Sequence, residues 1–249
     1  MNRPCTIVIP CYNEEARFPF DDFVAFVDAN PSIRFLLVND GSKDNTLEVL
    51  RRASVGREEQ VGVIDQPNNG GKGEAVRSGM LTALKQPGCL YAGFWDADMA
   101  TPLRLIALLM EVLATQTGVA MVFGARVKLL GRHVERRAMR HYLGRIFATV
   151  VSTALRLPIY DTQCGAKLFR VADETEELFA EPFSSRWVFD VEIIARFIRQ
   201  RKYNMPSVEK SIYEFPLPEW RDVAGSRVRP QDFLRAFFDI LKIYRHYSQ

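Results

Sequence analysis

The sequence predicts an α/β protein in which a mostly parallel central sheet is flanked by helices. Short apolar runs alternate with segments of helical periodicity through the first half of the chain, which is typical of βαβ units. The first apolar runs each end in a cluster of polar residues and glycines, where a turn is expected. With 249 residues, 47% of them hydrophobic, the chain is long enough to bury a complete core.

The predicted elements of the first half follow from this alternation. Strands are expected at residues 5–9, 34–38, 61–65, 90–95 and 119–124. Helices are expected at residues 14–29, 44–53, 73–85 and 102–114, and Asp44 is a candidate cap for the second of them. Parallel neighbouring strands need crossover helices of this kind.

The regular alternation stops after residue 124. A long helix is expected over residues 136–155, basic at its start and apolar toward its end. A loop at 160–165, a strand at 167–171, a helix at 189–201 and an edge strand at 211–215 follow. The last segment, residues 231–247, predicts an amphipathic helix because it places Phe233, Phe237, Leu241 and Tyr244 at helical spacing.

Composition restricts the class of protein. No run approaches the roughly 18 apolar residues that a membrane span requires. The first residues lack the apolar core of a signal peptide. The four cysteines form neither a C-x-x-C pair nor a disulfide framework. We therefore expect a reduced cytoplasmic protein with incidental thiols.

The sequence Asp96-Ala97-Asp98 places two carboxylates directly after a predicted buried strand. In an open α/β sheet, ligands bind at the carboxyl ends of the strands. Two neighbouring carboxylates repel each other unless a cation neutralises them, and oxygen ligands suit Mg²⁺ or Mn²⁺ shared with substrate phosphates. A solvated loop or a helix cap is the alternative interpretation of so short a motif.

Polar clusters also follow the first three predicted strands, at residues 10–15, 39–44 and 68–73. Each by itself is compatible with an ordinary turn or helix cap. The last contains Gly-Gly-Lys-Gly, which lacks the spacing and the terminal Ser or Thr of a Walker A loop. Together with the aspartate pair, they predict a nucleotide diphosphate site along one edge of the sheet.

A basic segment interrupts an otherwise slightly acidic chain. Residues 126–145 contain seven arginine or lysine residues and one glutamate, whereas the net charge of the whole chain is +3. Such a cluster points to a phosphate-bearing ligand, an anionic membrane surface or nucleic acid. A solvated helix face is the alternative on charge alone.

The motifs resemble those of family 2 glycosyltransferases. The segments IPCYNE (residues 9–14), VNDGSKDNT (38–46), NGGKG (69–73) and DAD (96–98) occur in the order and approximate spacing of that family. DTQCGAKLF (161–169) and RWVFDVE (186–192) resemble its branch of dolichyl-phosphate and polyprenyl-phosphate glucosyltransferases. The resemblance extends from residue 6 to about residue 244 and implies a GT-A fold and an inverting transfer from a nucleotide sugar.

The resemblance assigns roles to individual residues. Those expected to bind the nucleotide sugar are Pro10, Tyr12, Glu14, Asp40, Lys72, Asp96 and Ala97. Of these, the first three are expected to line the nucleoside pocket, and Asp40 is expected to contact the base. Asp96 and Asp98 are the expected ligands of Mg²⁺ or Mn²⁺, with Asp98 the more direct one. The expected catalytic residues are Asp98, Asp161 and Arg126, and the expected acceptor-binding residues are Arg136, Arg137, Arg140, Arg186 and Trp187.

The chemistry implied is the transfer of a hexose, glucose from UDP-glucose, to a polyprenyl or dolichyl phosphate. A lipid phosphate is already ionised near neutral pH, so cations that position it suffice, whereas a hydroxyl acceptor needs a general base such as Asp161. We expect one catalytic domain over residues 1–249, with a nucleotide-binding half at 1–125 and an acceptor-binding half at 126–249. The basic and apolar surfaces predict peripheral contact with the cytoplasmic face of a membrane, and no nucleic acid partner is expected.

Three alternatives remain open from the sequence. A family 2 enzyme that glycosylates a soluble glycan or another hydroxyl acceptor would depend on Asp161 as a base. A nucleotide-binding module without turnover is disfavoured because both aspartates of the D-x-D motif are present. A nucleotidyltransferase normally has a glycine-rich signature after its first strand, where this chain has Tyr12-Asn13-Glu14.

Overall fold

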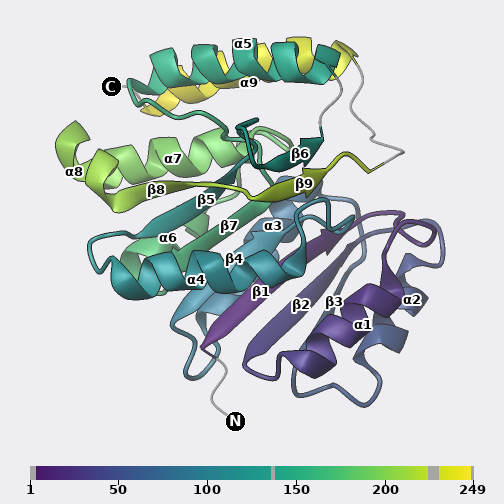
Figure 1. Cartoon of the computed structure of the whole chain (residues 1–249). Helices are drawn as coiled ribbons and strands as arrows, with labels where there is room; N and C mark the ends of the chain where they lie inside the picture. The colour runs from purple at the N-terminus through teal and green to yellow at the C-terminus, as the bar shows by residue number, and fades with distance from the viewer. Residues whose placement is uncertain (1–3, 136–137, 224–229, 248–249) are drawn as a thin grey trace.

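A seven-stranded mixed sheet forms the centre of the protein (Figure 1). The computed structural model describes residues 4–135, 138–223 and 230–247. The strand order is β3-β2-β1-β4-β7-β5-β8. The strands are β1 (Cys5–Cys11), β2 (Ile33–Asp40), β3 (Val61–Gln66), β4 (Tyr91–Trp95), β5 (Met121–Ala125), β7 (Ala166–Arg170) and β8 (Ile212–Pro216). A separate parallel pair joins β6 (His133–Glu135) to β9 (Glu219–Arg221).

One strand of the central sheet runs against the others. β7 pairs antiparallel with both β4 and β5, while the remaining pairs are parallel. Trp95 at the end of β4 is therefore opposite Ala166 at the start of β7. The loop that leads into β7 consequently lies at the sheet edge where the parallel strands end.

Helices cover both faces of the sheet (Figure 1). They are α1 (Phe20–Ala29), α2 (Thr46–Ser54), α3 (Lys72–Leu84), α4 (Ile106–Thr115), α5 (Ala138–Leu155), α6 (Asp173–Ala180), α7 (Phe189–Gln200), α8 (Met205–Ser211) and α9 (Pro230–Tyr247), with a short 3₁₀ turn η1 (Leu103–Leu105) before α4. Helices α1, α2 and α4 pack on one face, and α3, α6 and α7 pack on the other.

The alternation of side chains along each strand produces two cores. In β1, Ile7 and Ile9 pack with Phe23 of α1, whereas Val8 between them packs on the opposite face with Met80 of α3. Successive side chains of a strand point to opposite faces, so a strand covered on both sides is apolar at nearly every position. The apolar runs in the sequence therefore reflect strands that are buried on both faces of the sheet.

Helices α5 and α9 form a further layer on the second core. In Figure 1 they lie side by side at one end of the molecule, beyond α7. The buried side chains of α9 recur at helical spacing along the face that packs on α7: Ala236, Ile240, Ile243 and Tyr247. The amphipathic helix predicted for residues 231–247 is thus present, beginning at Pro230.

The predicted α/β class, the mostly parallel sheet and the predicted strands are confirmed, including β8 at the edge. The helix predicted from residue 14 is wrong in its first part, because α1 begins at Phe20. The amides of Asn13, Glu14 and Glu15 bond instead to side chains between β2 and the start of α2, and residues 15–17 form turns. The sequence interpretation missed β6, β9, α6 and α8.

Gly79 marks the closest approach of α3 to the sheet. A Cβ atom at this position would lie 2.3 Å from Cγ1 of Val8 and 3.0 Å from Cγ2 of Val38. Both methyl groups belong to fully buried strand residues, so neither can move into free space. The absence of a side chain at Gly79 therefore sets the distance between helix and sheet.

We expect Gly79→Ala to lower the free energy of unfolding by about 1–3 kcal/mol through overpacking. Alanine normally stabilises a helix by roughly 1 kcal/mol relative to glycine, so the predicted sign is the reverse of the propensity effect. Gly118→Ala is the control because nothing lies within 4 Å of its added Cβ. Urea denaturation measures both variants, and a stabilised Gly79→Ala protein would contradict the packing argument.

Candidate active site

The carboxyl ends of β1, β2, β4 and β5 meet at one edge of the sheet, joined there by the loop before β7. The predicted polar clusters lie at this edge, because parallel strands present their carboxyl ends on the same side. Pro10 lies within β1, Tyr12 directly follows it, and Asp40 ends β2. Asp96 directly follows β4.

The loops after β1 and β2 are joined by hydrogen bonds between backbone and side chains. The amide of Asn13 donates to Ser42 Oγ at 3.0 Å, and the amide of Glu14 donates to Thr46 Oγ1 at 2.7 Å. In return, Asn13 Oδ1 accepts the amide of Lys43 at 2.7 Å. These bonds hold the walls of the predicted nucleoside pocket in one arrangement. Asp44 accepts the amide of Thr46, the first residue of α2, at 3.1 Å.

Asp40 organises the glycine-rich loop between β3 and α3. Its carboxylate accepts the amide of Gly70 at 2.7 Å, the amide of Gly71 at 2.9 Å and the side-chain amide of Asn69 at 2.9 Å. Asp40 is buried, and this burial raises its pKa although the two loop amides act in the opposite direction. The predicted contact between Asp40 and a base stays a prediction.

Arg186 holds the same loop from the opposite side. Its guanidinium donates to the carbonyl oxygen of Gly70 at 3.0 Å, and to the carbonyl and Oδ1 oxygens of Asn69 at 2.7 and 2.5 Å. Gly71 has φ +90°, and an added Cβ there would lie 2.7 Å from Arg186 Nε. A glycine is needed here both for this backbone conformation and for the close approach of the arginine.

Each aspartate of the D-x-D motif is paired with a cation. Lys72 Nζ, at the start of α3, lies 2.5 Å from Asp96 Oδ1. Arg17 Nη2, from the turns after β1, lies 3.1 Å from Asp98 Oδ2. A Cβ at Gly165 would lie 1.9 Å from Asp96 Oδ2, so the missing side chain at that position makes room for the carboxylate.

The two aspartates differ in electrostatic environment. Burial acts to raise the pKa of Asp96, but the charges of Lys72, Arg126 and Lys167 outweigh it and hold the pKa below its ordinary value. Burial, followed by the charge of Asp96, raises the pKa of Asp98. Neighbouring carboxylates with pKa values shifted in opposite directions are characteristic of functional sites.

Arg126 and Asp161 form a largely buried ion pair at the end of β5. Arg126 Nε lies 2.6 Å from Asp161 Oδ2 and Nη2 lies 2.8 Å from Oδ1, while the Arg126 amide also donates to Oδ2. The guanidinium lies 5.3 Å from the ring centroid of Trp220. Burial acts to lower the pKa of Arg126, but the charge of Asp161 and its hydrogen bonds outweigh burial and raise the pKa above its ordinary value, so the guanidinium stays charged.

Glu214 of β8 fixes the loop that carries Asp161. Its carboxylate accepts the amides of Tyr160 and Asp161 at 2.8–2.9 Å. Burial raises the pKa of Glu214, and the two amides act against that shift. The sequence interpretation missed this residue, although a lone carboxylate within the predicted edge strand at 211–215 was a usable signal.

A fully buried ion pair lies beneath the site. Lys167 Nζ contacts Asp190 Oδ1 at 2.5 Å and donates to the carbonyl oxygens of Thr162 and Cys164 at 2.9 and 2.6 Å. Lys167 has no solvent exposure, and its ammonium lies 5.4 Å from the ring centroid of Phe94. Burial raises the pKa of Asp190, while the charge of Lys167 acts to lower it. The pair was not predicted.

Most of the residues predicted to bind the nucleotide sugar lie together at this edge of the sheet. The residues predicted to bind the acceptor do not form one cluster among the described residues. Trp187 is 37% exposed, so it is a surface residue rather than part of the core. Arg140 lies in α5, where its backbone alone is described, and Arg136 and Arg137 lie outside the described residues. Ala97 is buried in the core beneath the first sheet face. Arg17, which the sequence interpretation did not select, belongs to the site.

The donor set of the motif fits a divalent cation that shares its ligands with a substrate. Within the described ranges, no group of three or more His, Cys, Asp or Glu side chains is arranged to hold a metal ion. Asp96 and Asp98 supply hard oxygen atoms from two side chains, and Mg²⁺ is commonly bound by one or two carboxylates plus substrate phosphates. The residues therefore fit Mg²⁺ or Mn²⁺ in the presence of a nucleotide diphosphate.

Residues 6–175 match the model of Glycosyl transferase family 2. The chain belongs to this family. A dolichyl-phosphate β-glucosyltransferase of Trichomonas vaginalis is 31% identical over 96% of this chain and 70% of that protein. The enzymes of the same name from Saccharomyces cerevisiae and Homo sapiens are each 31% identical over 90% of this chain, and the aligned parts cover 68% and 69% of their lengths.

The fold of this chain is also found in a solved structure of a glucosyl-3-phosphoglycerate synthase. Glucosyl-3-phosphoglycerate synthase from Mycobacterium tuberculosis, crystallised with Mn²⁺, UDP-glucose and phosphoglyceric acid, superposes with a TM-score of 0.68. The two proteins are 18% identical, and the superposition covers 98% of this chain and 80% of the synthase. The predicted GT-A fold is thereby confirmed.

We expect Lys167→Met to lower the free energy of unfolding by about 3–5 kcal/mol, because it leaves the Asp190 carboxylate buried without its partner. Lys85→Met is the matched control: Lys85 pairs with Glu176 at 3.4 Å, and both of these side chains are exposed. Exposed pairs contribute roughly 0–1 kcal/mol, so the control should stay close to wild type. Equal effects of the two substitutions in chemical denaturation would contradict a structural role for the buried pair.

Proposed function

We propose that the protein is an inverting glucosyltransferase that transfers glucose from UDP-glucose to a dolichyl or polyprenyl phosphate, with Mg²⁺ or Mn²⁺ at the D-x-D motif. The observation that carries the proposal is the sheet-edge site, in which Asp96 and Asp98 lie beside the glycine-rich loop in a chain about 30% identical to dolichyl-phosphate β-glucosyltransferases over nearly all its length. We assign the donor to residues 1–125 and the acceptor to residues 126–249.

The charges of the site suit the breaking of the bond between glucose and the diphosphate. Negative charge develops on the leaving diphosphate as the anomeric carbon gains positive character. Lys72 and Arg17 are cations beside the D-x-D motif, where they stabilise that charge as it develops. A divalent cation bound at Asp98 supplies further charge neutralisation at the leaving group. The structural neighbour crystallised with Mn²⁺ and UDP-glucose supports this choice of metal and donor.

The acceptor side favours a phosphate over a hydroxyl group. Both carboxylate oxygens of Asp161 accept hydrogen bonds from Arg126, and Oδ1 also accepts the amide of Gln163 at 3.2 Å. A carboxylate engaged in this way is poorly placed to take a proton from a hydroxyl acceptor. A phosphate is already ionised and needs no base, so orientation by a charged residue such as Arg126 is enough for its oxygen to attack the anomeric carbon.

We test this function by measuring UDP release from UDP-glucose with a short polyprenyl phosphate, with and without Mn²⁺ or Mg²⁺. Asp98→Asn should abolish metal-dependent transfer, a loss of at least a hundredfold, while the protein still unfolds cooperatively. Asp28→Asn is the control because Asp28 forms an exposed ion pair with Arg57, away from the motif. Near-normal turnover by Asp98→Asn would overturn the metal assignment. Transfer to a soluble hydroxyl acceptor, with lipid phosphate inert, would favour the alternative acceptor class.

The surface formed by α5 and α9 supports peripheral contact with a membrane. In the described parts of the chain, no helix combines the length and the apolar composition needed to cross a bilayer. An open groove of about 630 Å³ runs between the two helices, and Phe237, Leu241 and Tyr244 are among the residues that line it. Phe238 of α9 is 73% exposed and Ile146 of α5 is 56% exposed, so both helices carry exposed apolar side chains, and on α9 these lie apart from the face packed on α7.

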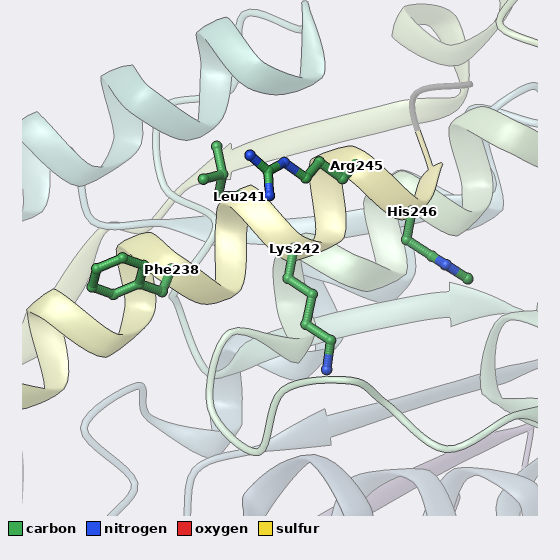
Figure 2. A pocket seen from close by; sticks show the side chains of 5 residues that line it. All are labelled: Phe238, Leu241, Lys242, Arg245 and His246. Carbon is green, nitrogen blue, oxygen red and sulfur yellow. The ribbon is translucent and has the colours of Figure 1, made fainter.

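Basic side chains accompany this apolar face. Figure 2 shows Phe238 and Leu241 followed along α9 by Lys242, Arg245 and His246. Exposed aromatic and aliphatic side chains beside lysine and arginine are typical of helices that lie in the interface of an anionic membrane. Such a surface would bring the active site to a lipid acceptor.

Vesicles containing phosphatidylserine should recruit the protein in flotation experiments, and added salt should weaken recruitment by screening the exposed charges. Lys242→Gln combined with Arg245→Gln should weaken binding by roughly 2 kcal/mol, or about thirtyfold, at about 1 kcal/mol for each basic residue. Arg51→Gln combined with Arg52→Gln is the control, since these exposed residues lie on α2, far from α9 in Figure 1. Equal loss in both double variants would contradict docking through α9.

A further inference from the structure

Arg17 connects the loop after β1 to the D-x-D motif. One guanidinium nitrogen, Nη2, lies 3.1 Å from Asp98 Oδ2, and the other, Nη1, lies 3.3 Å from Glu14 Oε1. The Arg17 amide donates to the carbonyl oxygen of Glu14 at 3.0 Å, which fixes the turn that carries the side chain. This turn lies in the first part of the helix predicted for residues 14–29, which does not form. Arg17 is therefore directed at the D-x-D motif and does not lie on a helix face.

The guanidinium is accessible and incompletely paired. The side chain of Arg17 is 21% exposed and that of Asp98 is 25% exposed, so a ligand can reach the pair. Arg17 Nε is buried and has no hydrogen-bond partner among the described residues. If the side chain turned away from Asp98, Nε and Nη2 together would present the fork geometry that binds two oxygens of a phosphate.

This arrangement makes Arg17 a competitor for the carboxylate that we assign to the metal. A divalent cation that binds Asp98 has to displace Arg17 or accept a positive charge within a few ångströms, and either costs free energy. Lys72 has the same relation to Asp96, at 2.5 Å. In the absence of a nucleotide, both carboxylates of the motif are therefore neutralised by the protein itself.

We propose that Arg17 is a positioning residue that couples metal binding to donor binding: it occupies Asp98 in the nucleotide-free enzyme and moves to the donor diphosphate when the metal takes Asp98. The inference rests on the proposed function, because it takes the diphosphate and the metal to bind at this motif. It goes beyond that function in naming the residue that makes the two ligands depend on each other.

The exchange conserves favourable charge pairing. Before binding, Arg17 pairs with Asp98; afterwards the metal pairs with Asp98 and Arg17 pairs with the negatively charged diphosphate. Metal without diphosphate leaves Arg17 with Glu14 as its one remaining carboxylate partner of the two, and diphosphate without metal has to compete with Asp98 for the guanidinium. Each ligand therefore strengthens the binding of the other by the same factor, as linkage requires, and such factors are typically about 5–150-fold.

A purely structural role makes a different prediction. If Arg17 served as a fixed link between Glu14 and Asp98, its removal would lower stability and loosen the site for every ligand alike. Under the exchange role, its removal strengthens the binding of the metal alone and weakens the dependence on UDP. The direction of the change in metal-only affinity separates the two roles.

The experiment is a Mn²⁺ titration followed by electron paramagnetic resonance, with and without saturating UDP, on the full chain. For the wild-type protein we expect UDP to tighten Mn²⁺ binding by at least fivefold. For Arg17→Gln we expect Mn²⁺ alone to bind at least threefold more tightly than it does to wild type. UDP should still tighten Mn²⁺ binding, because its phosphates also coordinate the metal, but by a factor at least threefold smaller than in wild type. Arg17→Lys, which keeps the charge but not the fork, should bind Mn²⁺ alone as wild type does and show reduced coupling.

Arg57→Gln is the matched control, since Arg57 forms a bidentate ion pair with Asp28 at 2.6 Å on the surface, and it should leave both titrations unchanged. Coupling by UDP that persists undiminished in Arg17→Gln would overturn the role of Arg17 while leaving the proposed function intact. Weaker Mn²⁺ binding by Arg17→Gln in the absence of UDP would also overturn it, in favour of the fixed link. A wild-type protein that binds no Mn²⁺ even with UDP would refute the metal assignment and this inference together, and the transfer assay would then test the glucosyltransferase activity separately.

Discussion

The buried ion pair between Lys167 and Asp190 is the interaction on which the geometry of the site depends. Asp190 belongs to α7 and Lys167 to β7, and the same ammonium group holds the carbonyl oxygens of Thr162 and Cys164. The pair thus fixes the loop before β7, which carries Asp161 and Gly165. Since Gly165 lies directly against the Asp96 carboxylate, the orientation of the D-x-D motif depends on this buried charge pair.

The same principle extends across the edge of the sheet, where acidic and basic side chains alternate. Arg126 is paired with Asp161, Lys72 with Asp96, and Arg17 with Asp98. Carboxylates gathered at one strand edge would repel each other if left unpaired, and burial would add to the cost. Cations supplied by neighbouring loops remove this cost and are already in place when an anionic diphosphate arrives. The charge pairs that stabilise this edge of the sheet therefore also supply the cations that the proposed donor diphosphate would meet.

Much of the fold and of the donor site could be predicted because the signals are local. Apolar runs with polar ends located β1, β2 and β4, and the rule that parallel strands end at one edge brought Asp40 and Asp96 to the same place. Partners that are distant in sequence could not be predicted in this way. Arg186 bonds to Asn69, 117 residues away, so its use in holding the glycine-rich loop has no local signal.

The helix predicted from residue 14 failed for a related reason. Residues 14–29 have helical periodicity, but the first two amides of this segment bond to Thr46, at the start of α2, and to Asp44 in the loop before it. Tertiary hydrogen bonds therefore override the local preference, and they place Arg17 at the site. The reversed direction of β7 was equally hidden, because an apolar run reads the same in either direction.

The antiparallel direction of β7 has a functional consequence that a fully parallel sheet would lack. It places the start of β7, and not its end, beside the end of β4, so that Ala166 pairs with Trp95. The loop before β7 then reaches both the donor motif, through Gly165, and the acceptor side, through Asp161 and its partner Arg126. One short segment therefore spans the two halves of the proposed reaction. A shift of this loop would disturb the surroundings of Asp96 and of Arg126 together, and the loop is anchored by both Lys167 and Glu214.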